Sequence, residues 1–128
     1  MRKLLICLAL IGTAGCTTLR GPAPQAALPP DHYVVFFQPR TSELAVDAQA
    51  IVRQAAMAAQ QRKASKIEIA VPPAVPGGPN VVEGRYTAIQ NIISASGVAP
   101  GAYARAVLSQ DAIALAGGND RAEIRLVQ

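Results

Sequence analysis

The sequence has few of the side chains that enzymes use most often for catalysis and metal binding. Its 128 residues include one His, two Cys and no Trp, and only 4% are aromatic. One His and two Cys are too few for an ordinary four-ligand zinc site, and they leave little material for nucleophilic catalysis assisted by His. The pair Gly77-Gly78 is followed by Pro79 rather than by Lys-Ser or Lys-Thr, so it does not form a phosphate-binding loop. We therefore expect a protein that is not an enzyme and uses no cofactor or metal.

Charge is also scarce, at 16% of residues, whereas 51% of residues are hydrophobic. This composition is too apolar for an intrinsically disordered chain, and the length suits a single domain. Lys and Arg number 12 against 8 Asp and Glu, a formal net charge of +4. Two of the basic residues, Arg2 and Lys3, lie at the N-terminus, and without them the net charge is +2. A nucleic-acid partner, which requires a clustered basic surface, is therefore not expected.

The first 15 residues have the layout of a secretory signal peptide. The positive pair Arg2-Lys3 precedes an apolar run, Leu4 to Ile11, and small residues follow. The run is too short to span a bilayer, which takes about 20 residues. The next residues, Thr13-Ala14-Gly15-Cys16, resemble the bacterial lipobox, with Thr13 in place of the usual Leu. The alternative is an ordinary signal peptide with an incidental cysteine.

The lipobox resemblance implies cleavage before Cys16 and attachment of lipid, including acyl chains such as palmitate, to its thiol. Cys7 would leave with the signal peptide, so no disulfide could form. Several acyl chains anchor a protein stably, because each buried methylene contributes about 0.8 kcal/mol. Thr17 follows Cys16, where lipoproteins retained at the inner membrane often have Asp. We therefore expect an outer-membrane lipoprotein whose domain lies in the periplasm.

Residues 17–31 are rich in Pro, Ala and Gly and show no hydrophobic period. They predict a semi-extended linker that reaches about 45 Å if it is fully polyproline-like, although a disordered arm would have the same composition. The expected organisation is a signal peptide at 1–15, a lipidated cysteine and linker at 16–31, and one domain at 32–128.

The domain is predicted to alternate strands and helices in the order β-α-β-α-β-β. The expected strands are His32 to Phe37 (a central strand, apolar on both faces), Lys66 to Val71, Tyr103 to Leu108 and Arg121 to Val127. The expected helices are Val46 to Arg62, with an Ala-rich apolar stripe, and Val81 to Ala95. Asn80 and Glu83 form a capping-box pattern, and Gly97 suits the position after the second helix. Residues 112–118 fit no single element. The order predicts an α+β fold with two helices on one face of a mixed four-stranded sheet.

Arg85 lies in line with the apolar stripe of the second predicted helix, four residues after Val81 and four before Ile89. An unpaired arginine in a buried stripe is costly, and its planar fork suits a carboxylate. Alternatively, its stem covers the sheet edge while its head reaches water. Among the remaining candidates, His32 suits a structural or exposed role, and Tyr86 a packing role rather than a ligand platform.

Several stretches together resemble the OmpA-like domain, the peptidoglycan-associated module of Gram-negative envelopes. The stretches run from Tyr33 to Val127 and include Tyr33 to Phe37, Ser42-Glu43-Leu44, Asp47 to Ile51, Lys66 to Ile69, Arg85 with Ile89, Ile93 and Gly97-Val98, and Asn119 to Ile124. In that family an Asp after the second strand and an Arg in the second helix bind the diaminopimelate of the peptidoglycan peptide. The resemblance therefore implies peptidoglycan as a partner and Arg85 as the first ligand contact, with Asn80, Arg121 and the loop 72–79 around it.

The chain departs from the family pattern at this site. No acidic residue lies between Glu68 and Glu83, and the Leu and Ser before the family Arg are Val81 and Val82. Losing the acidic partner removes one charge-assisted contact, of about 1.5–3 kcal/mol. Two functions are therefore expected: an OmpA-like lipoprotein that binds or sits against peptidoglycan and tethers envelope layers, or a degenerate domain that serves as a protein-interaction module in an envelope or secretion complex.

Overall fold

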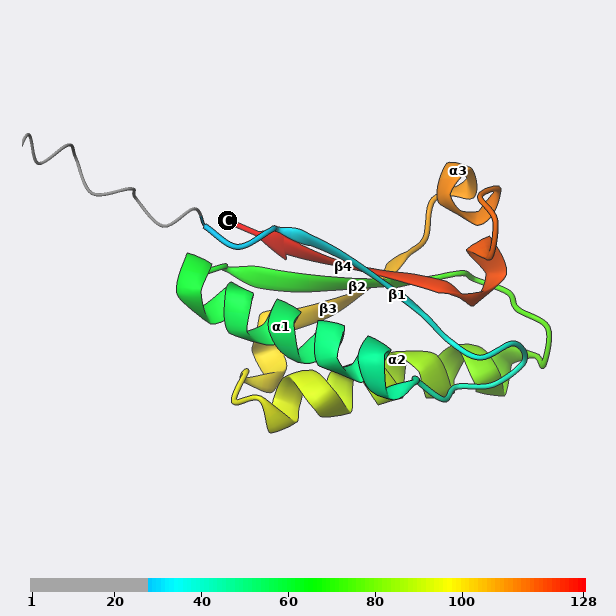
Figure 1. Cartoon of the computed structure of the whole chain (residues 1–128), viewed down its shortest axis with the longest axis horizontal. Helices are drawn as coiled ribbons and strands as arrows, with labels where there is room; N and C mark the ends of the chain where they lie inside the picture. Colours follow the sequence, from blue (N-terminus) through cyan, green and yellow to red (C-terminus); the bar gives the residue numbers. More distant parts are fainter. Residues whose placement is uncertain (1–27) are drawn as a thin grey trace, which may run out of the picture.

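A computed structural model describes residues 28–128, so the predictions for the signal peptide, Cys16 and most of the linker lie outside the described residues. Three helices pack with a four-stranded mixed sheet (Figure 1). The elements, in chain order, are β1 (His32–Phe36), α1 (Val46–Arg62), β2 (Lys66–Val71), α2 (Pro79–Ala95), the 3-10 turn η1 (Pro100–Ala102), β3 (Tyr103–Val107), α3 (Gln110–Ile113), the 3-10 turn η2 (Gly118–Asp120) and β4 (Arg121–Val127).

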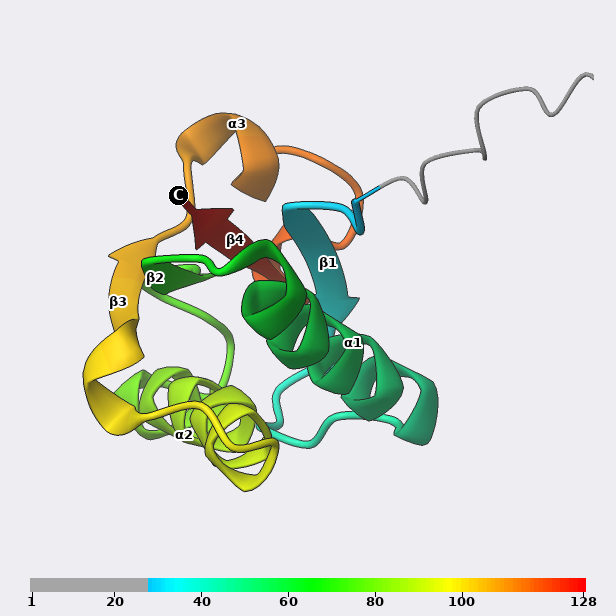
Figure 2. The same ribbon diagram turned by 90° about the vertical axis from the view of Figure 1, so that its left-hand side faces the viewer.

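The sheet has the strand order β1-β4-β2-β3. Strand β4 is antiparallel to both β1 and β2, and β3 is parallel to β2. The long helices α1 and α2 lie on one face of the sheet, and the short α3 lies on the other side (Figure 2). The predicted α+β fold, with two helices on one face of a mixed sheet, is confirmed.

The core lies between the sheet and the two long helices. Val35, Ile69 and Ile124 point to the helix side from three neighbouring strands and are almost fully buried. Small side chains on α1 allow that helix to lie close to the sheet. The buried residues of α1 are Ala48, Val52, Ala55, Ala56, Ala58 and Ala59.

The prediction that β1 is a central strand is wrong, because β1 lies at an edge of the sheet. Its apolar residues have another explanation. Val35 and Phe37 are buried on the helix side, whereas Phe36 is half-exposed and lies near Gly117 on the other side. The apolar pattern on both faces therefore reflects cover from a helix and a loop, not flanking strands.

The start of α2 also differs from the capping-box prediction. The helix begins at Pro79, and the N-cap residue is Gly78, which makes no side-chain cap. Pro79 fixes a helical φ at a position where a missing N–H costs little, so the helix starts before Asn80. At the other end, Gly97 adopts φ 90° directly after the C-cap residue, as predicted.

Candidate functional site

Arg85 is the most deeply buried charged side chain among the described residues. It lies in the second turn of α2, and its exposed fraction is 0%. The alternative in which its stem covers the sheet edge and its head reaches water is therefore wrong. The guanidinium lies inside the domain, where it needs both hydrogen-bond acceptors and a counter-charge.

The surrounding loops supply both. Arg85 Nε donates to the carbonyl oxygen of Thr41 at 2.8 Å, and Nη1 donates to the carbonyl oxygen of Asn119 at 2.6 Å. Nη2 donates to the Asp120 carboxylate at 2.9 Å and, over a longer 3.4 Å, to the carbonyl oxygen of Gln38. We call this set of groups the Arg85 site. It joins three segments far apart in sequence: the loop after β1, the second turn of α2, and η2.

Local features of the sequence allow these segments to meet. Gly84 precedes Arg85, and a Cβ at this position would lie 2.8 Å from Cβ and Oγ of Ser42. The absence of a side chain therefore lets the loop after β1 lie directly on α2. The Phe37 ring completes the enclosure, with its centroid 4.9 Å from the guanidinium carbon of Arg85, a distance at which a cation and an aromatic face attract each other.

The other two predicted site residues do not join Arg85. Asn80 is exposed at the start of α2. Arg121 lies next to Asp120 in the chain, but its side chain turns to Glu123, with Nε 3.0 Å from Oε1. The three predicted ligand contacts, Arg85, Asn80 and Arg121, therefore do not form one site.

Glu123 is the centre of a charged cluster that the sequence prediction did not include. It is nearly buried, yet its carboxylate contacts His32 Nε2 at 3.0 Å, Arg121 at 3.0 Å and Arg125 Nη2 at 3.2 Å. Burial alone would raise the pKa of Glu123, but hydrogen bonds from Arg121 and His32 and the charges of both residues bring the pKa below its ordinary value. The alternation of Arg121, Glu123 and Arg125 along one strand is the sequence signal that could have indicated it.

Glu83 does not have the capping role that its position predicted. Instead of capping α2, its carboxylate forms an ion pair with Arg105 of β3 at 2.6 Å. The Arg105 guanidinium also lies 4.8 Å from the ring centroid of Tyr86. Tyr86 is buried, and its hydroxyl donates to the carbonyl oxygen of Ala106. Glu83 and Tyr86 therefore join α2 to β3, and Tyr86 has the packing role expected for it.

The loop before α2 forms a small apolar cavity of about 130 Å³. No acidic side chain lines it. Its lining residues are Pro73, Ala74, Val75, Gly78, Pro79 and Val82. This cavity has no group that could bind an ammonium ion by charge.

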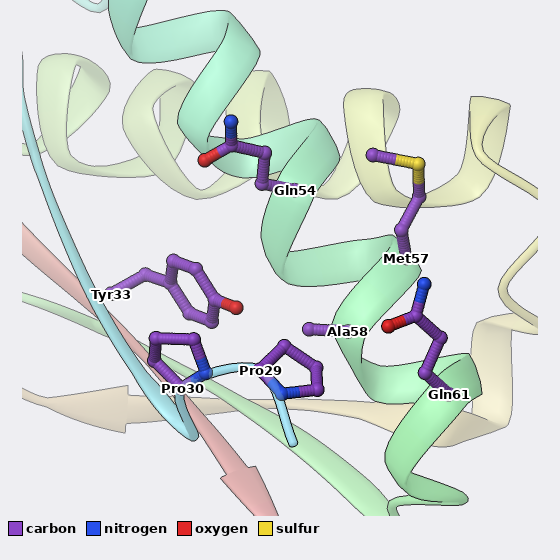
Figure 3. Close-up of a pocket in the computed structure, with 7 residues that line it drawn as sticks. All are labelled: Pro29, Pro30, Tyr33, Gln54, Met57, Ala58 and Gln61. Carbon is purple, nitrogen blue, oxygen red and sulfur yellow. The ribbon is translucent and has the colours of Figure 1, made fainter. Parts of the chain in front are cut away.

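A larger cavity, of about 320 Å³, lies where the chain enters the domain (Figure 3). Pro29, Pro30 and Tyr33 form one wall, and Met57 and neighbouring residues of α1 form the other. Arg62 fixes this entry point by donating from Nη1 to the carbonyl oxygen of Pro29 at 2.7 Å. The last residues of the predicted linker therefore pack against the domain.

Within residues 28–128, no three or more His, Cys, Asp and Glu side chains are grouped as a metal site would require. In the same range, no helix has both the length and the apolar character needed to cross a membrane. The polar groups of the described domain are mostly engaged with one another.

Solved structures of bacterial envelope domains are similar to this chain in fold. The OmpA-like domain of FopA1 from Francisella tularensis matches with a TM-score of 0.60 and 10% identity, over 73% of this chain and 69% of that chain. The periplasmic domain of Helicobacter pylori MotB matches with a TM-score of 0.55 and 15% identity, over 73% and 70%. A longer form of the MotB periplasmic domain matches with a TM-score of 0.51 and 12% identity, over 100% and 91%.

No protein-family model and no curated protein matches the sequence. At 10–15% identity, likeness to solved structures carries information about the fold alone. The domain has the OmpA-like α+β fold that the sequence resemblance implied.

Proposed function

We propose that this chain is an outer-membrane lipoprotein whose periplasmic OmpA-like domain sits against peptidoglycan and tethers the envelope layers. The observation that supports this most is the combination of an OmpA-like fold with a lipobox-like segment ending at Cys16. The part of the Pro- and Ala-rich segment before Pro29, residues 17–28, would let the domain lie up to about 37 Å from the anchor if it is fully polyproline-like.

In this proposal the protein works by binding, not by catalysis. His32 Nε2 lies 3.0 Å from Glu123, and among the described residues no serine hydroxyl forms a hydrogen bond with that ring. A nucleophile needs an adjacent base within hydrogen-bond reach. The described domain presents no such pair around its only histidine.

A specific observation favours a second function, that of a protein-interaction module without wall binding. Arg85 has internal acceptors for all three guanidinium nitrogens, and the loop at 72–79 has apolar residues where an acidic partner would be needed. Under this second proposal, Arg85 holds the domain together, and the exposed part of the loop contacts another envelope protein.

Co-sedimentation with purified peptidoglycan separates the two functions. The full lipoprotein, purified in detergent, should be retained by peptidoglycan at low salt if the first proposal holds. Absence of retention at low salt would leave the interaction module as the better proposal. Arg53→Ala is a suitable control because Arg53 is an exposed arginine on α1, so its loss should not change retention.

The lipid anchor needs a separate test, because wall binding does not depend on it. Labelling cells with radioactive palmitate should mark the wild-type protein and leave Cys16→Ser unlabelled. Fractionation should then place the labelled protein with the outer membrane. Equal labelling of both proteins would exclude Cys16 as the attachment point.

A further inference from the structure

Strand β3 forms one edge of the sheet and pairs with β2 alone. Figure 2 shows it at the margin of the sheet, between the face that α2 covers and the side on which α3 lies. Its sequence, YARAV, contains neither Pro nor Lys, and its register with β2 runs without a bulge. Natural proteins often protect an edge strand with such features, because its unpaired backbone groups invite pairing with another strand. The β3 edge has none of these three protections.

The pairing with β2 shows which backbone groups of β3 are free. The N–H of Leu108, directly after the strand, donates to the carbonyl oxygen of Val71 at 3.1 Å. Backbone groups of alternate residues in a strand face the same side. The groups that face away from β2 therefore belong to Tyr103, Arg105 and Val107. Within residues 28–128, no strand lies on that side to pair with them.

The side chains at this edge combine one apolar residue with one ion pair. Arg105 is the only charged residue of β3, and its guanidinium lies 2.6 Å from the carboxylate of Glu83 on α2. Both side chains are largely exposed, at 46% and 61%. The ion pair offsets the positive charge that would otherwise repel an approaching strand. Val107, which is 67% exposed, adds apolar surface at the end of the strand.

We propose that two copies of this chain pair through β3, in antiparallel orientation about a two-fold axis at Arg105. In this register Arg105 lies opposite Arg105 of the second copy, and Tyr103 lies opposite Val107. Each of these opposed residues exchanges both N–H···O bonds with the residue that it faces, so the pairing satisfies all the free groups of the strand. The same patch serves both copies, as an isologous interface requires.

The charges favour a second copy over an unrelated strand. Two opposed arginines alone would be destabilising, because like charges directly opposite each other repel. Each copy also brings its Glu83, so two cations and two anions meet around the axis, and each Arg105 can contact both carboxylates. At each end of the pairing, the exposed Val107 gains an aromatic neighbour in Tyr103, a favourable cross-strand combination. The edge is thus complementary to itself in charge, in apolar contact and in backbone hydrogen bonding.

Sedimentation equilibrium of the full chain in density-matched detergent tests this proposal, and a monomer–dimer equilibrium is expected. Val107→Lys places a charge on the edge and removes the apolar contact at both ends of the pairing. It should therefore raise the dissociation constant of the dimer roughly 10- to 100-fold. Val46→Lys is the matched control, because Val46 is 78% exposed on α1, and it should leave the constant unchanged. Arg105→Glu should also weaken the dimer by placing four carboxylates around the axis, and adding Glu83→Arg to that variant should restore it.

A wild-type chain that stays monomeric throughout the micromolar range would overturn the proposal. So would equal dissociation constants for the wild type and Val107→Lys, or equal weakening by Val46→Lys. Failure of Glu83→Arg to restore the Arg105→Glu variant would contradict the register, since the four charges would then not meet at the axis. Circular dichroism confirms that each variant is folded, as expected for changes at exposed side chains. The proposal does not rest on wall binding, and peptidoglycan is absent from the experiment, so the two can fail separately.

Discussion

Replacing Arg85 by Met should destabilise the domain severely, because Met fills most of the space and supplies no donors. The carbonyl oxygens of Thr41 and Asn119 and the carboxylate of Asp120 would lose the donor that Arg85 supplies. The Gln38 carbonyl would keep its bonds from the N–H and the hydroxyl of Thr41. Each buried acceptor left unpaired costs about 1–3 kcal/mol, although Asp120 is partly exposed and can turn to water. The expected loss is therefore about 3–5 kcal/mol, which matches the cost of breaking a buried ion pair.

Urea unfolding followed by circular dichroism measures this loss directly. A domain of this size has a total free energy of unfolding of about 5–15 kcal/mol, so Arg85→Met should lose a large share of its stability. Arg85→Lys keeps the charge but cannot reach all the acceptors. Its free energy of unfolding should therefore lie between those of the wild type and Arg85→Met. Arg53→Met is the matched control, because Arg53 is exposed on α1, and it should change the free energy by less than about 0.5 kcal/mol. A loss below about 1 kcal/mol in Arg85→Met would refute the structural role of the Arg85 site.

Three further changes test other parts of the structure. The pKa of Glu123 is lower in the folded protein than in the unfolded chain. Its carboxylate therefore stabilises the fold above the unfolded pKa of about 4.3, and this stabilisation is lost as the pH falls through the folded value. Between pH 6 and 3, the free energy of unfolding measured in urea should thus fall less for Glu123→Gln than for the wild type. Gly84→Ala should lower the melting temperature, because the new Cβ would collide with the side chain of Ser42, and this cost exceeds the gain from the better helix propensity of Ala. The double variant Gly84→Ala with Ser42→Gly should recover most of the lost melting temperature. Tyr86→Phe should cost about 1–2 kcal/mol in the same urea assay, because the carbonyl of Ala106 loses its donor, and an unchanged midpoint would contradict that bond.

Periodicity in the sequence was enough to predict the elements that form the core. The helix from Val46 to Arg62 and the strand from Arg121 to Val127 have the bounds that their apolar patterns indicated. The position of Arg85 in a buried stripe was also visible, because a polar residue interrupts an otherwise regular pattern. These features are set by residues close together in the sequence, within one helix or strand, so the local hydrophobic pattern is enough to predict them.

The partners of Arg85 could not be predicted in the same way. Thr41 lies 44 residues before Arg85 in the chain, and Asn119 lies 34 residues after it. Both accept through backbone carbonyls, which every residue type has, so the sequence has no signal for either contact. Asp120 has a distinctive side chain, but only the path of η2 brings it to the guanidinium. The edge position of β1 was missed for a related reason, since cover from α1 on one face and from the loop at Gly117 on the other makes this edge strand as apolar as a central one.

The most direct test of the proposed function is quantitative co-sedimentation of the full wild-type protein with purified peptidoglycan at low salt. Circular dichroism first confirms that the protein is folded at the assay temperature. The account predicts measurable retention of the protein by peptidoglycan. Absence of retention would contradict the proposed wall binding.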